Sequence, residues 1–119
     1  MKNETKTTIQ TMSHARGFQI SGLSGYTLSI GVGAGHYCEN YTLSIGGDES
    51  EYKPTATMEV AVMDCETGEF VCLPYDVAGH VPGSNLCCLI EAVESHDWER
   101  VCLLCNETGE PDFSKFPNH

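Results

Sequence analysis

Apolar and polar residues alternate along two early segments of the chain that have identical sequences. Residues 26–31 read YTLSIG, so that Tyr26, Leu28 and Ile30 share one face of an extended chain and the polar residues share the other. The same six letters return at residues 41–46. The pattern predicts two antiparallel neighbouring strands with one shared apolar face, joined by a loop that contains AGHYCEN. Copied strands are also prone to slip, and the alternative is that the second copy is an insert within a loop.

A second alternating run follows a polar linker. In TMEVAVMD, Met58, Val60 and Val62 face one side and Glu59 faces the other, which indicates a strand. The turn residues in DCETGE come next, and EFVCLP reads as a partner strand. We therefore expect a second hairpin over residues 57–73.

One segment has the spacing of an amphipathic helix. In GSNLCCLIEAVESH, Leu86, Leu89, Ile90 and Val93 recur at helical intervals, and Ser84 is available as the amino-terminal cap. The next segment, WERVCLLC at residues 98–105, is an apolar run with aromatic and β-branched members, and we interpret it as a last strand.

These elements together predict an α+β fold. We expect a mostly antiparallel sheet of about five or six strands with one amphipathic helix packed on it. A chain of 119 residues suits one hydrophobic core. We expect residues 1–15 to form a flexible amino-terminal arm, residues 16–106 a single domain, and residues 107–119 a polar carboxy-terminal tail.

The charge balance restricts the partners. The chain has 17 Asp and Glu residues against 6 Lys and Arg residues, for a net charge of -11. Long-range repulsion disfavours direct binding to nucleic acid or to an anionic membrane, which leaves small molecules and basic protein surfaces. Without a long apolar stretch or the apolar middle of an export signal, the chain is expected in the cytoplasm. Its 7 cysteines are then expected to be reduced thiols that pack as small apolar groups.

The loop GVGAGHYCEN is the first candidate binding element. Gly33 and Gly35 allow a ligand to approach the backbone closely, Tyr37 offers a ring for stacking, and His36 offers a partner for a phosphate or a hydroxyl. No helix pattern follows directly, so the loop matches neither the dinucleotide fingerprint nor the P-loop. A glycine-containing hairpin bend is the alternative.

Trp98 and Arg100 form the second candidate binding element. On the predicted last strand these two residues share a face, where stacking and positive charge act together on an anionic ligand. A salt bridge between Arg100 and a neighbouring glutamate is the alternative.

Metal binding and catalysis have weaker signals. Cys102 and Cys105 have the spacing of half a zinc site, which Cys87, Cys88 or His96 would complete. Buried thiols that line a strand and a helix are the favoured interpretation, so we predict no metal site.

No catalytic group can be assigned. His36 and Cys38 point to the same face of an extended segment, but no third group is identified to hold an activating base. We therefore expect a binding protein that is not an enzyme and uses no cofactor.

The order of these segments resembles a known class of proteins. SIGVGAGHYCEN, the strand MEVAVMD, and VAGHVPG leading into an amphipathic helix are together similar to small phage-encoded accessory proteins such as the Thoeris anti-defence sponges. The resemblance covers about residues 26–93. It implies a homo-oligomer in the host cytoplasm that sequesters a small anionic signal, such as a cyclic nucleotide, to counter host defence.

Two other functions remain open. One is an acidic, DNA-mimicking inhibitor whose partner is a host protein, a nuclease or an effector. The other is an interaction module that is stabilised by zinc.

Overall fold

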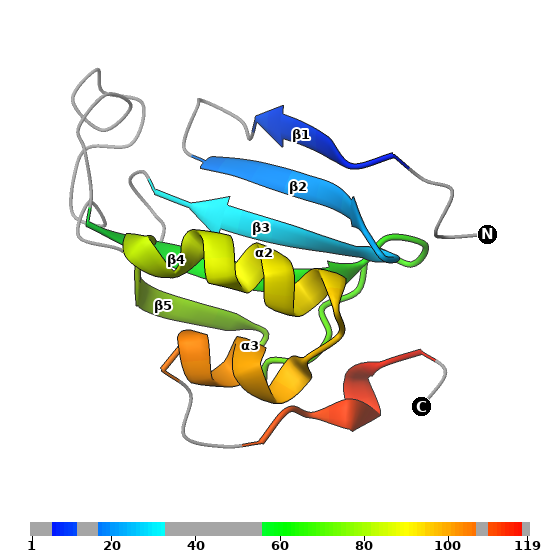
Figure 1. Cartoon of the computed structure of the whole chain (residues 1–119). Helices are drawn as coiled ribbons and strands as arrows, with labels where there is room; N and C mark the ends of the chain where they lie inside the picture. The colour runs from blue at the N-terminus through cyan, green and yellow to red at the C-terminus, as the bar shows by residue number, and fades with distance from the viewer. Residues whose placement is uncertain (1–5, 12–16, 33–55, 107–109, 118–119) are drawn as a thin grey trace.

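The computed structural model describes residues 6–11, 17–32, 56–106 and 110–117, and it has an α+β fold (Figure 1). Five strands form one antiparallel sheet, in which each strand pairs with the next along the chain. The strands are β1 (Thr8–Thr11), β2 (Gly17–Leu23), β3 (Tyr26–Gly31), β4 (Thr57–Asp64) and β5 (Val77–Pro82). The predicted fold class is confirmed.

Two helices complete the described part of the fold. Helix α2 (Leu86–Glu94) packs against β2 and β3, and α3 (Trp98–Leu104) packs against α2. The predicted helix therefore exists, and a second helix accompanies it. Neither has the length and apolar character required to cross a lipid bilayer, a statement that covers the described residues only.

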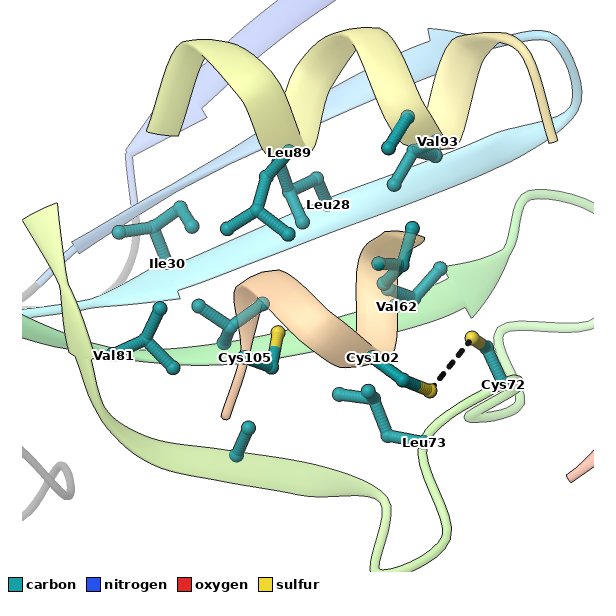
Figure 2. Packing of buried hydrophobic residues seen from close by; sticks show 14 of the residues in the cluster. Leu28, Ile30, Val62, Cys72, Leu73, Val81, Leu89, Val93, Cys102 and Cys105 are labelled. Carbon is teal, nitrogen blue, oxygen red and sulfur yellow. Dashed lines mark hydrogen bonds between the residues drawn. The ribbon is translucent and has the colours of Figure 1, made fainter. Parts of the chain in front are cut away.

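The core lies between the sheet and the helices (Figure 2). Leu28, Ile30 and Val62 project from the central strands toward Leu89 and Val93 of α2, and all five are almost completely buried. Complete burial of such a side chain contributes about 1.5–3 kcal/mol. The alternation along the strands and the helical spacing along α2 were thus sufficient to identify these core residues.

The other face of the central strands carries small polar side chains. The Oγ of Ser21 and the Oγ1 of Thr27 are 3.0 Å apart, and Gln19 Nε2 donates to Ser29 Oγ at 3.5 Å. Cross-strand pairs of this kind stabilise a sheet and satisfy side chains that have little exposure. The two faces of the sheet thus differ in chemistry, as the alternation predicts.

The hairpin expected between the two YTLSIG copies is not formed along the first copy. The first copy is β3, and it pairs along its length with β2 on one side and with β4 on the other. No edge of β3 is left for another strand. The second copy, residues 41–46, lies outside the described residues.

The hairpin expected over residues 57–73 is also different in the structure. After the turn, Phe70 makes one isolated bridge with Met63, and the strand that pairs with β4 on the side away from β3 is β5. Cys72 has φ 72°, in the left-handed region, and an extended strand cannot continue through that conformation.

The strand predicted at residues 98–105 is wrong, because this segment forms α3. Val101, Cys102 and Cys105 are buried on one side at helical spacing, and the Asp97 side chain accepts from the Arg100 amide at the amino terminus. A short apolar run has no clear periodicity, which is why residue type favoured a strand here. The Ser84 cap is wrong as well: Ser84 lies in the 3₁₀ turn η3 (Gly83–Asn85), and α2 begins without a side-chain cap.

Both terminal segments contain more order than their polar composition indicated. Thr8–Thr11 form the edge strand β1, which needs only backbone hydrogen bonds because its side chains are exposed. At the other end, the Asp112 amide donates to the Cys72 carbonyl at 2.8 Å, and the 3₁₀ turn η4 (Phe113–Lys115) follows. Residues 8–11 and 112–115 therefore have regular structure, and the remaining residues of the predicted arm and tail lie largely outside the described ranges.

Candidate functional site

Four aromatic rings meet at one end of the sheet, and we call them the aromatic corner: Tyr26, His96, Trp98 and Phe116. Trp98 is central, with its ring centroid 4.9 Å from Tyr26, 5.3 Å from His96 and 4.9 Å from Phe116. The His96 and Trp98 rings are stacked, whereas Tyr26 meets Trp98 edge to face. Such pairs contribute about 0.5–1.5 kcal/mol each beyond the area that they bury. His96 is exposed and the other three rings are half-buried, so the corner belongs to the surface as well as to the core.

A tight hairpin turn positions Tyr26. Ser24 and Gly25 connect β2 to β3, and both have positive φ, 52° and 98°. Two central residues with positive φ are typical of the two-residue turn that fits the twist of a hairpin. The Gly25 carbonyl also accepts from the Cys65 amide at 2.9 Å, which attaches the turn after β4 to the same place.

The end of α2 positions His96. The Asp97 amide donates to Ala92 O at 2.8 Å and the His96 amide donates to Val93 O at 3.1 Å, the bonding pattern that ends many helices at a glycine. Here the left-handed position is occupied by His96, with φ 58°. The His96 Nε2 lies 2.9 Å from the Ser24 carbonyl oxygen, and the ring stacks on Trp98. A strained backbone with side-chain contacts of this kind indicates that the imidazole itself is required.

The carboxy-terminal segment closes the corner. Phe116 covers one side of Trp98 and stacks on the exposed Phe113 at 6.0 Å. The Lys115 Nζ holds this segment to the loop before β5, donating to Leu73 O at 3.0 Å and to Pro74 O at 2.7 Å.

Exposed acidic residues lie on the elements that form or adjoin the corner. Glu66 lies in the turn after β4, Glu94 at the end of α2, and Asp97 and Glu99 at the start of α3, and all four residues are exposed. Lys6, Arg100 and Lys115 are the cationic residues of the described part of the chain. The described acidic residues are Glu59, Asp64, Glu66, Glu69, Asp76, Glu91, Glu94, Asp97, Glu99, Glu110 and Asp112.

The predicted site residues have different outcomes. Gly33, Gly35, His36 and Tyr37 lie outside the described residues. Trp98 belongs to the aromatic corner and Arg100 is exposed on α3.

The shared face predicted for Trp98 and Arg100 is wrong. Both residues lie on a helix rather than on a strand, and side chains two positions apart on a helix point in nearly opposite directions.

Sequence reasoning missed the other members of the corner. Tyr26 was identified only as a residue of the apolar strand face, and His96 only as a surface histidine or a metal ligand. The sequence contains a signal for the turn in Ser24 and Gly25, but nothing in it brings Phe116 next to Trp98, because that contact is long-range.

The cysteine pair Cys102 and Cys105 is buried, together with Cys72 (Figure 2). The Cys72 and Cys102 sulfurs are 4.0 Å apart. The pKa of Cys72 is raised well above its usual range, mainly by burial and further by the neighbouring thiols. Of the residues that would complete a zinc site, Cys87 is exposed on α2 and His96 belongs to the aromatic corner. Within the described ranges, no three His, Cys, Asp or Glu residues are arranged to hold a metal ion. The geometry favours buried thiols that pack as apolar groups.

Comparison of the chain with protein-family models, with curated proteins and with solved structures finds no match.

Proposed function

We propose that the protein is a non-enzymatic binding protein, and that the aromatic corner takes a cationic segment of a protein partner. One observation carries the proposal: rings packed around Trp98 reach the surface, and the exposed acidic residues Glu94, Asp97 and Glu99 flank His96 and Trp98 in the chain. Arg and Lys side chains bind over aromatic rings. Because His96 and Phe116 pack on Trp98, the exposed rings at this corner are those of His96 and Phe113. A net charge of -11 raises the rate of encounter with a basic surface.

The distribution of charge favours a basic partner over an anionic one. Lys115 already donates to two carbonyl groups and to the Asp76 carboxylate at 2.6 Å, so this cation is engaged inside the protein. The exposed acidic residues Glu94, Asp97 and Glu99 flank His96 and Trp98 in the chain instead. The resemblance to phage-encoded accessory proteins extends the proposal to an acidic inhibitor of a host nuclease or effector, acting in the host cytoplasm.

Trp98 gives a direct measurement, because it is the single tryptophan of the chain. Titration with an arginine-rich peptide should change Trp98 emission in a saturable way, and added salt should weaken the binding. The double variant Glu94→Gln/Glu99→Gln should bind several-fold more weakly. The matched control Glu91→Gln/Glu110→Gln changes the net charge by the same amount at exposed positions that are farther from His96 and Trp98 in the sequence. Equal losses in the two double variants would reject the aromatic corner as the binding surface.

A nucleotide-like signal is the second candidate ligand, as the resemblance implies. The observation that favours it is the stacked His96 and Trp98 pair at the surface. Arg100 lies on another face of the same helix and is a separate predicted contact. Cyclic nucleotides titrated against Trp98 fluorescence, with native mass spectrometry of the same samples, test ligand binding and homo-oligomer formation together. Binding that disappears in Arg100→Ala would support this candidate. Peptide binding without any nucleotide response would reject the nucleotide candidate and support the basic partner.

A further inference from the structure

The amino-acid sequence of the central strand, β3, occurs twice in the chain. Residues 41–46 repeat the sequence of Tyr26–Gly31 letter for letter, and they lie outside the described residues. We propose that either copy can occupy the β3 position between β2 and β4, so that residues 41–46 can replace residues 26–31 as the central strand. The proposal does not depend on which partner the protein binds.

The β3 position accepts the second copy because its contacts are set by six residues that both copies contain. Both edges of β3 make backbone pairs, with β2 and with β4, and backbone hydrogen bonds do not distinguish side chains. Leu28 and Ile30 fill the core, and Thr27 Oγ1 lies 3.0 Å from Ser21 Oγ and 3.3 Å from Cys65 Sγ. The equivalent residues of the second copy are Thr42, Leu43 and Ile45.

The residues that flank the two copies decide which copy is preferred. Ser24 and Gly25 make the tight turn before the first copy, whereas Glu39 and Asn40 precede the second. After the first copy, Val32 packs against the core, and Gly47 stands at that place after the second. Both differences favour the first copy. The exchanged arrangement is therefore the minor state.

Chain connectivity permits the exchange. In the described arrangement residues 24–25 connect β2 to β3, and residues 32–56 lead to β4. After the exchange these connections would be residues 24–40 and 47–56. The entropy of loop closure changes only with the logarithm of loop length, so length is redistributed at small cost.

The exchange has a topological consequence. The start of β3 lies at the aromatic corner, because Tyr26 is its first residue (Figure 1). In the described arrangement Val32 follows β3 at its opposite end, and residues 33–40 come next in the sequence. In the exchanged arrangement they would precede the strand, and the chain between the copies would leave the sheet at the aromatic corner.

Paired substitutions test the exchange through non-additivity. Leu43→Ser alone should leave the urea midpoint of unfolding unchanged. Leu28→Ser should lower the midpoint by a limited amount, because the intact second copy can then take the β3 position. In the Leu43→Ser background, the same Leu28→Ser change should lower the midpoint by at least twice as much. Leu89→Ser, on α2, is the control and should have the same effect in both backgrounds. Equal effects of Leu28→Ser in the two backgrounds would overturn the proposal.

A disulfide trap tests the exchange in a chain with an intact core. Because Thr27 Oγ1 is 3.3 Å from Cys65 Sγ, the variant Thr27→Cys should form a disulfide with Cys65 when it is incubated with oxidised glutathione. If the second copy enters the β3 position, Thr42→Cys should accumulate a disulfide with the same cysteine, more slowly, as peptide mapping would show. Formation of the first disulfide without any of the second would overturn the proposal.

Discussion

Removing the ammonium group of Lys115 should destabilise the protein more than removing the ion pair that this group makes. Lys115 Nζ donates to two main-chain carbonyls and to Asp76 Oδ1 at 2.6 Å, and its side chain is 22% exposed. The Asp76 side chain is 48% exposed, so solvent screens the ion pair, which should contribute about 0–1 kcal/mol. The two carbonyl bonds are charge-assisted and better shielded, and bonds of this type contribute about 1.5–3 kcal/mol each before the desolvation of the lysine is subtracted. Lys115→Met, which keeps the apolar stem, should therefore cost about 2–3 kcal/mol, against at most about 1 kcal/mol for Asp76→Asn.

Urea unfolding followed by Trp98 emission and by circular dichroism measures both effects. Since Phe116 covers Trp98 and follows Lys115 directly, Lys115→Met should also shift the native emission to longer wavelength. The slope of the unfolding free energy with urea should remain constant if the domain still unfolds in one step. A loss below about 0.5 kcal/mol for Lys115→Met, or equal losses for the two variants, would refute the assignment of the carbonyl bonds as the main contribution.

Three further predictions concern strained or buried positions. Gly22 and Gly68 both have positive φ, 82° and 73°. In denaturant unfolding, Gly68→Ala should lower the free energy of unfolding by about 1 kcal/mol. Gly22→Ala should lower it more, because the new Cβ would clash with the Lys6 carbonyl oxygen. His96→Gly should be more stable than His96→Ala by about 1 kcal/mol, since both lose the ring and only glycine relieves the left-handed backbone; equal stabilities would contradict the strain. Because burial raises the pKa of Cys72 in the folded state, its thiol ionises first in the unfolded chain, and stability should fall as pH rises above about 8.5. Cys72→Ala should reduce that slope by at most about 1.4 kcal/mol per pH unit, and an unchanged slope would argue against the shift.

The parts of the fold that could be predicted are those in which periodicity and burial agree. Leu28 and Ile30 alternate with Thr27 and Ser29, and the structure places the first pair in the core and the second on the polar face. In WERVCLLC, Trp98, Val101, Cys102 and Cys105 do have helical spacing, but the consecutive apolar residues 101–105 obscure it, and the β-branched and aromatic residues favoured a strand. Its helical conformation depends on contacts with α2 and with the core, which local preference cannot contain.

The aromatic corner was beyond prediction for a related reason. Its rings come from β3, from the end of α2, from the start of α3 and from the carboxy-terminal segment, so that every contact except the one between His96 and Trp98 spans a long stretch of chain.

The structure adds a local departure from backbone preference at His96. Position 96 follows a helix in a conformation that glycine adopts without strain, and the side chain found there touches both the hairpin turn and Trp98. A residue that is locally unfavourable must be compensated by its surroundings, and the surroundings here are the proposed binding surface. If His96→Gly is at least as stable as the natural chain yet fails to bind the arginine-rich peptide, then stability does not explain the imidazole and binding does.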